Sequence, residues 1–247
     1  MRPHPDPDAV AGFRAARSTV LAAVAEACGR AGRDPASVQL VAVSKLVAVD
    51  RLTAAVAAGL TELGENRVQE AESKAPHVPG ARWHLIGPLQ SNKARRALEL
   101  FETIESVDSI ELARRLDRLA DEVRASALGV YLQVNVDRDP AKAGFLPDVL
   151  EAELPGLAEL SNLALLGLMT VGRLVDSPEE ARPTFARLRE LSVRLRTDTP
   201  ALGAGLSMGM SDDYTVALEE GATVIRVGRA LFGQRPGLRE GPGGRDH

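Results

Sequence analysis

Lys45 is the residue of this chain best suited to covalent chemistry. It follows Val41-Ala42-Val43-Ser44, an apolar stretch typical of a buried strand, so its side chain starts in a buried environment. Burial disfavours the charged form of a lysine, and a neutral amine can condense with an aldehyde. The pattern fits a lysine that condenses with an aldehyde, and it fits equally well a lysine that reaches from a rim into water.

The segment Ser-Met-Gly-Met-Ser-Asp-Asp at 207–213, here called the anion loop, is a candidate phosphate site. Small residues such as Gly209 let main-chain N–H groups approach an anion, and the following helix start favours negative charge. The hydroxyls of Ser207 and Ser211 can add donors. Ordinary capping of that helix by Ser211 or Asp212 would explain the same residues.

Arg226 interrupts the β-branched stretch 224–227, where an unpaired charge is costly. It must therefore meet either a ligand or a carboxylate inside the protein. Gly228 follows this stretch, and its N–H could serve the same anion as the anion loop.

Two further polar residues follow or interrupt expected strands. Asn66 could orient a ligand oxygen, whereas His84 lies within a strand and could be either a packing residue or a catalyst. No group of His, Cys and carboxylate residues has metal-ligand spacing, so we expect no metal. The Gly-x-Ser-x-Gly motif of serine hydrolases is also missing.

The elements that must position these residues alternate along the chain. Short apolar stretches are followed by helical ones, which predicts parallel strands joined by right-handed crossovers. Eight such units favour a single (β/α)₈ TIM barrel, whose strand ends meet at one mouth. A doubly wound sheet is the alternative, but its Gly-x-Gly-x-x-Gly fingerprint is missing. The expected strands are 38–45, 62–64, 83–86, 103–107, 130–135, 164–169, 206–207 and 223–227. The expected helices are 8–31, 50–58, 68–74, 92–100, 109–125, 146–154, 178–196, 212–219 and a short one after Gly228.

Composition and net charge limit the class of protein and the kinds of partner. With 247 residues, 45% hydrophobic and 26% charged, the chain is typical of one soluble domain, which we expect over 1–235 with a disordered tail at 236–247. A net charge of −4 gives no argument for nucleic acid or membrane. No run of about 18 apolar residues is present. The single cysteine, Cys28, and the lack of an export signal favour the cytoplasm. We expect a monomer.

Six segments together resemble the pyridoxal phosphate homeostasis proteins, also called proline synthase co-transcribed proteins, over about residues 10 to 234. They read Leu-Val-Ala-Val-Ser-Lys at 40–45, Gly-Glu-Asn-Arg-Val-Gln-Glu at 64–70, Trp-His-Leu-Ile-Gly-Pro-Leu-Gln-Ser-Asn-Lys at 83–93, Gly-Leu-Met at 167–169, Ser-Met-Gly-Met-Ser-Asp-Asp at 207–213 and Val-Ile-Arg-Val-Gly at 224–228. One departure is Leu46-Val47-Ala48, where the family often has Thr-x-Pro after the lysine.

The resemblance implies a fold-type III barrel, like the N-terminal domain of alanine racemase but without its C-terminal β domain. It implies pyridoxal 5′-phosphate (PLP) as a Schiff base on Lys45, with the phosphate on the anion loop and the Gly228 amide, Arg226 at the pyridine nitrogen and Asn66 near the ring. The full candidate set for cofactor binding is Lys45, Asn66, His84, Met169, Ser207, Gly209, Met210, Ser211, Arg226 and Gly228.

The function that this resemblance implies is PLP (vitamin B6) homeostasis, which indirectly affects amino-acid and keto-acid balance. Arg226 cannot accept a proton from the pyridine ring, which restrains carbanion chemistry. Too few residues follow Gly233 for the tyrosine-bearing domain of racemases. We expect a carrier without an established catalytic activity, with PLP-dependent apoenzymes as possible partners. A small racemase or lyase, and a barrel that binds a phosphate ligand without a Schiff base, are the alternatives.

Overall fold

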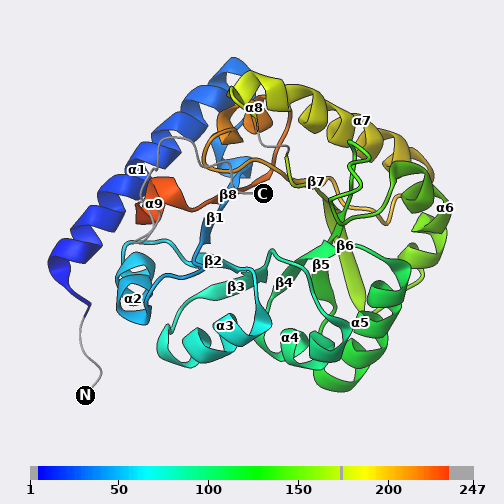
Figure 1. The fold of residues 1–247 in the computed structure, drawn as a ribbon, viewed down its shortest axis with the longest axis horizontal. Coiled ribbons are helices and arrows are strands. Elements are labelled where there is room, and N and C mark those ends of the chain that lie inside the picture. Colours follow the sequence, from blue (N-terminus) through cyan, green and yellow to red (C-terminus); the bar gives the residue numbers. More distant parts are fainter. Residues whose placement is uncertain (1–4, 173–174, 234–247) are drawn as a thin grey trace.

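The structure is a closed barrel of eight parallel strands, ringed by helices (Figure 1). It is a computed structural model that describes residues 5–172 and 175–233; the tail expected at 236–247 lies outside this range. Each strand pairs with the next along the chain, and the last pairs with the first. The predicted (β/α)₈ barrel is therefore confirmed, and the doubly wound sheet is wrong. The strands are β1 (Gln39–Val43), β2 (Glu62–Glu65), β3 (Arg82–Leu85), β4 (Thr103–Val107), β5 (Leu128–Gln133), β6 (Leu163–Met169), β7 (Gly205–Ser207) and β8 (Val224–Val227).

The helices cover the outside of the barrel. They are α1 (Pro7–Arg30), α2 (Val49–Ala57), α3 (Val68–Lys74), α4 (Ala94–Leu100), α5 (Ile110–Val123), α6 (Pro147–Ala158), α7 (Arg182–Asp198), α8 (Tyr214–Glu219) and α9 (Arg229–Phe232). Short 3₁₀ turns stand at η1 (Pro35–Ser37), η2 (Ala75–His77), η3 (Ser91–Lys93) and η4 (Pro178–Ala181).

Several helix boundaries differ from the sequence prediction by one to four residues, and α7 begins at Arg182 because residues 178–181 form the 3₁₀ turn η4. α6 continues past Pro155 to Ala158, because the buried side chains of Leu154 and Leu157 hold the last turn against the core despite the missing N–H of the proline. α8 begins at Tyr214 rather than at residue 212, because the preceding residues form a separate turn. That turn belongs to the anion loop.

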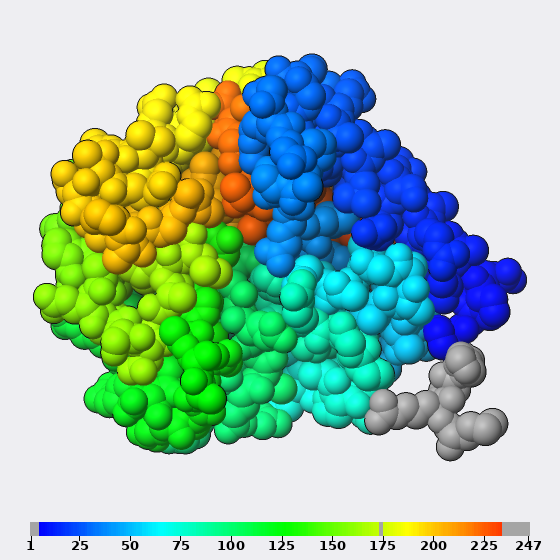
Figure 2. Space-filling model, turned by 180° about the vertical axis from the view of Figure 1, so that it is seen from behind, coloured from blue at the N-terminus to red at the C-terminus, as the bar shows by residue number. Residues whose placement is uncertain are grey.

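The helix α1 precedes the first strand and covers the closing seam of the barrel. It contacts α2, α8 and α9, and the view from behind shows this N-terminal segment (blue) beside the end of the described chain (orange-red) (Figure 2). The Phe13 ring meets the Phe232 ring edge-on, with 5.5 Å between the centroids. Cys28 is fully buried on this helix.

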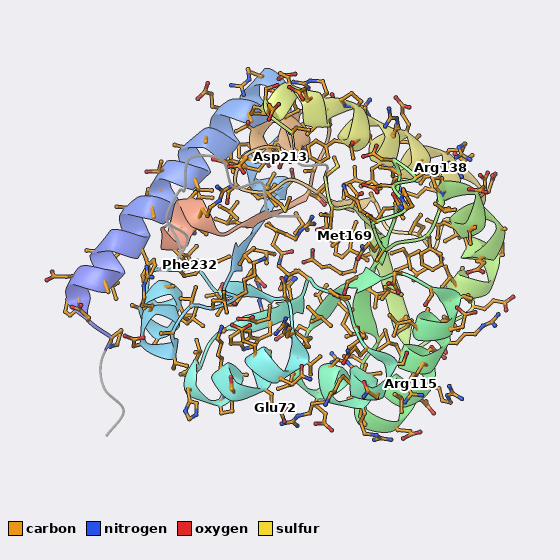
Figure 3. All side chains as sticks on the ribbon, in the orientation of Figure 1. Glu72, Arg115, Arg138, Met169, Asp213 and Phe232 are labelled. Carbon is orange, nitrogen blue, oxygen red and sulfur yellow. The ribbon has the colours of Figure 1, made fainter. Side chains whose placement is uncertain are left out.

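The apolar core has two parts. The larger part lies between the strands and the helices, while four residues form a small cluster of their own: Val41, Tyr131, Met169 and Val224. Figure 3 shows Met169 inside the ring of strands, whereas Glu72 and Arg115 extend outward from the helices. This small cluster is accompanied by buried charged side chains, including His84, Glu105 and Arg226. The barrel interior is therefore partly ionic.

Candidate functional site

The candidate site lies at the carboxyl ends of β1, β7 and β8, which are neighbouring strands. Val41 is paired with Arg226, and Ser207 with Val224. Lys45 stands in a turn two residues beyond the end of β1 and is half-buried. A Cβ built on Gly228 would lie 3.4 Å from the Cβ of Val43, so the end of β1 lies directly beside Gly228. The closed barrel thus brings the lysine, the anion loop and Arg226 to one edge of its mouth.

The anion loop is tied to β8 by two hydrogen bonds. The N–H of Gly228 donates to the Ser211 hydroxyl at 3.2 Å, and the N–H of Arg226 donates to the Gly209 carbonyl at 3.0 Å. Ser211 therefore contacts the residue after β8 and does not cap a helix, and the residue before α8 is Asp213. The capping interpretation of Ser211 and Asp212 is wrong.

Gly209 is required at its position by the local backbone. Its φ is +93°, a conformation that residues with a Cβ rarely adopt, and an added Cβ would lie 2.6 Å from the Cβ of Ala217. The loop is fixed further by Asp213, whose carboxylate accepts from the Met210 N–H at 2.6 Å. Burial raises the pKa of Asp213, although the Met210 hydrogen bond and the Arg226 charge oppose that shift.

Arg226 is buried and points to polar partners inside the barrel. Its Nη2 donates to the Thr170 carbonyl at 2.7 Å, its Nη1 donates to the Ser207 hydroxyl, and Glu105 lies 3.8 Å from Nη1. Burial lowers the pKa of Arg226, and the charges of Glu105 and Asp213 oppose this shift. The carboxylate partner that the sequence left open is therefore Glu105.

Ser207 is the first residue of the anion loop and the last of β7, and its side chain is buried. Its hydroxyl donates to Oε2 of Glu105 at 2.6 Å and accepts from Arg226. The one hydroxyl hydrogen of this serine is thus directed into the barrel. Among the two serines of the loop, Ser211 stands closer to the position where an anion would contact the Gly228 amide.

His84 lies between two carboxylates in the barrel interior. Its Nδ1 is 2.9 Å from Oε1 of Glu105, and its Nε2 is 2.9 Å from Oε2 of Glu62. Both hydrogen bonds form together when each ring nitrogen carries a proton. Burial opposes ionisation of Glu105, but the hydrogen bond from His84 and the charges of His84 and Arg226 outweigh it and lower the pKa of this carboxyl. His84 is thus a fully partnered interior residue, and its contact with a cofactor stays a prediction.

Asn66 and Met169 follow or end their strands as expected. Asn66 comes directly after β2 and is half-buried, and a Cβ on Gly87 would lie only 2.4 Å from its carbonyl oxygen. The turn after β3 therefore packs on the backbone of Asn66 and fixes it. Met169 is fully buried at the end of β6.

A buried ion cluster, missed by the sequence prediction, stands behind the turn that holds Lys45. Nζ of Lys74 donates to the Ser44 carbonyl at 2.9 Å, to Glu65 at 2.8 Å and to Glu70 at 2.6 Å. Glu70 also accepts from the N–H of Leu46 at 2.5 Å, and Leu46 has a φ of +64°. Contacts on both sides of Lys45 thus fix its turn. They provide an alternative to the Thr-x-Pro that this chain lacks.

Two other kinds of site are absent from the described residues. Within 5–172 and 175–233, no helix is both long and apolar enough to cross a membrane. The same residues contain no group of three or more His, Cys, Asp or Glu side chains placed to hold a metal ion.

Sequence comparisons identify close relatives. A family model described as "Alanine racemase, N-terminal domain" matches residues 21–236. Two curated relatives carry the name pyridoxal phosphate homeostasis protein. The one from Pseudomonas aeruginosa is 44% identical and the match covers 87% of this chain and 93% of the relative. The one from Synechocystis is 42% identical, with 81% and 93% covered.

Solved structures agree with these matches. PipY of Synechococcus elongatus, solved with PLP bound, is 45% identical with a TM-score of 0.76, and the match covers 85% of this chain and 100% of PipY. An alanine racemase from Clostridium difficile has a TM-score of 0.71 over 91% of this chain and 57% of the racemase. At 15% identity it shows a shared fold only.

Proposed function

The chain belongs to the family of pyridoxal phosphate homeostasis proteins, and from this premise we propose that it binds PLP at the barrel mouth and carries it on Lys45. The physiological role of this binding is the control of the free cofactor. The observation that carries the proposal is the convergence of Lys45, the anion loop with Gly228, and Arg226 on three neighbouring strands.

The residues present fit the chemical parts of PLP. The cofactor supplies an aldehyde that forms a carbon–nitrogen double bond with a lysine amine, and an aromatic ring that withdraws electrons. Lys45 offers the amine. The Ser211 hydroxyl, which the Gly228 N–H holds in place, and the loop backbone at Gly209 would surround the phosphate. Gly209 also lets the loop pack closely on α8, since an added Cβ would collide with Ala217. Arg226 offers a fixed donor to the ring nitrogen.

The same residues favour carriage over catalysis. Arg226 donates hydrogen bonds and cannot take a proton from a ring nitrogen at neutral pH, so the ring stays a weak electron sink. The chain has two tyrosines. Tyr131 is bonded to Thr223, just before β8 and opposite the mouth, and burial raises its pKa to about 12. Tyr214 packs on the outer core from α8. The Tyr131 hydroxyl therefore lies beside the residue that precedes β8, whereas Lys45 follows the end of β1.

A titration with PLP tests the proposal. We expect the wild type to turn yellow, and borohydride reduction followed by mass spectrometry to place one adduct on Lys45. Lys45→Ala should lose both the absorbance band and the adduct, while Lys93→Ala, a lysine in η3, should keep them. A wild type that stays colourless would contradict the proposal. A wild type that binds PLP but gives no reduced adduct would support a phosphate site without covalent attachment.

The second candidate function is a small PLP-dependent racemase or lyase. It rests on the match to the alanine racemase domain, and it is less well supported than carriage because the closer relatives carry the homeostasis name. Incubation of the holoprotein with L- and D-amino acids in D₂O separates the two functions. Rapid deuterium exchange at the α-carbon would favour the enzyme.

Location, oligomeric state and partners belong to this proposal as well. We propose a cytoplasmic monomer that passes PLP to apoenzymes, since PLP-dependent enzymes need the cofactor where they fold. Size-exclusion chromatography and cell fractionation test the first two points. The transfer of PLP to apoenzymes is tested by mixing the holoprotein with a PLP-free apoenzyme. Reactivation should be faster than with the free PLP that the holoprotein releases on dialysis.

A further inference from the structure

A continuous line of polar contacts runs through the barrel interior to Arg226. It passes from Glu62 to His84, from His84 to Glu105, from Glu105 to Ser207 and from Ser207 to Arg226. The exposed fraction is 4% or less for His84, Glu105, Ser207 and Arg226. The line therefore connects the candidate cofactor site with Glu105 and Glu62, which the sequence prediction did not place there.

Glu105 is the branch point of this line. Its Oε1 faces Nδ1 of His84 at 2.9 Å, while its Oε2 accepts from Ser207 at 2.6 Å and lies 3.8 Å from Nη1 of Arg226. Both carboxylate oxygens are thus occupied, and the side chain is fully buried. Such a side chain has little freedom to move, so it provides a fixed point for its neighbours.

Glu105 balances the charge of Arg226 and helps to fix the direction of its side chain. A buried guanidinium is costly unless a carboxylate and hydrogen-bond acceptors surround it. Among the described residues, Glu105 is the carboxylate within ion-pair distance of Arg226. The Ser207 hydroxyl and the Thr170 carbonyl supply the acceptors. Loss of Glu105 would leave the guanidinium without its counter-charge and without a fixed Ser207 hydroxyl.

We propose that Glu105 is a positioning residue of the cofactor site, which holds Arg226 in the direction that meets the ring of the bound cofactor and acts partly through Ser207. This inference rests on the proposed function. Glu105 does not touch the cofactor. Its effect on binding passes through Arg226, and His84 with Glu62 holds it from the other side.

The test is Glu105→Gln, which keeps the shape of the side chain and removes its charge. We expect PLP to bind at least about tenfold more weakly and the absorbance maximum of the bound cofactor to shift, because the arginine facing the ring changes direction. Glu220→Gln is the matched control. Glu220 is a buried glutamate that pairs with Arg182 and Arg189 outside this line of contacts, and we expect the PLP dissociation constant of the variant to stay within about threefold of the wild type.

A double-mutant comparison shows whether Glu105 acts through Arg226. In an Arg226→Gln background, Glu105→Gln should weaken PLP binding no further. The inference is overturned if Glu105→Gln binds PLP with the wild-type constant and spectrum, if Glu220→Gln is equally impaired, or if the full loss persists without Arg226. The last two outcomes would mean that Glu105→Gln acts through general destabilisation and not through Arg226.

NMR of the arginine side chains separates this inference from the proposed function. In the PLP-free wild type, the Nη hydrogens of Arg226 should exchange slowly with solvent, because fixed hydrogen-bond partners protect them. In Glu105→Gln this protection should be lost. A wild type that binds no PLP but shows these signals would refute the function and leave the Glu105–Arg226 contact established.

If Glu105→Gln does not fold, Ser207→Ala removes only the bridging hydroxyl. Unchanged PLP affinity and unchanged Arg226 signals in that variant would overturn the inference.

Discussion

The main-chain N–H of Gly228 donates a hydrogen bond to the hydroxyl oxygen of Ser211, 3.2 Å away. This contact joins the loop after β7 to the residue after β8. Because the Ser211 oxygen accepts from Gly228, its own hydrogen can donate to an anion beside the two residues. The pair thus offers a phosphate group the Ser211 hydroxyl as a donor, while the Gly228 N–H fixes the position of that hydroxyl.

Ser211→Ala should weaken PLP binding about fivefold to tenfold, because one hydrogen bond to the phosphate is lost. The fold should be unaffected, since the residue is half-buried in a turn. Equilibrium titration by absorbance measures the change. Ser18→Ala, on the exposed face of α1, is the control and should bind as the wild type does. An unchanged dissociation constant in Ser211→Ala would remove the hydroxyl from the site.

Gly209→Ala should both destabilise the protein and impair PLP binding. The positive φ and the 2.6 Å approach to Ala217 each oppose a Cβ, so we expect a loss of about 1–3 kcal/mol in unfolding free energy. Urea denaturation measures it. Gly12→Ala is the opposite case, because Gly12 lies in α1 with nothing within 4 Å of an added Cβ, and it should stabilise the protein by about 0.5–1 kcal/mol. A stable Gly209→Ala would mean that the loop can adopt another backbone.

The order of strands and helices could be predicted from the sequence because each expected strand is short, apolar and followed by a helical stretch. The closed barrel then follows from eight such units, and it places Lys45, the anion loop and Arg226 at one mouth without any knowledge of contacts. Local pattern and a general rule of this fold were sufficient for these residues.

The contacts inside the barrel could not be predicted in this way. Ser207 and Glu105 are separated by 102 residues, and their hydrogen bond depends on the relative register of strands β4 to β7. A signal was nevertheless present, since Glu105 is a charged residue within a buried strand. The cluster around Lys74 was missed for a similar reason: a lysine at the end of a helix is usually exposed, and its burial follows from how α3 packs behind Ser44.

Acidification should destabilise the protein partly through Glu105. The folded-state pKa of this carboxyl lies below its ordinary value of 4.5, so its contribution to stability is present above that pH and is lost as the pH falls through the folded-state pKa. Glu105→Gln lacks this titration, and its unfolding free energy should therefore fall less steeply between about pH 5 and about pH 3. Urea midpoints across this range measure the slope. Glu159→Gln, an exposed glutamate, should keep the wild-type slope.

Tyr131→Phe should cost about 0.5–1.5 kcal/mol of unfolding free energy and leave PLP binding unchanged. The hydroxyl is bonded to Thr223 at the end of the barrel opposite the mouth, and the ring stays in the interior cluster with Val41, Met169 and Val224. Its pKa of about 12 keeps the hydroxyl protonated at neutral pH, so it supplies no base. Any α-deuterium exchange that the holoprotein catalyses should therefore proceed at the same rate in this variant. A large loss of exchange in Tyr131→Phe, without a change in PLP affinity, would make the tyrosine an acid or base and would favour the racemase over the carrier.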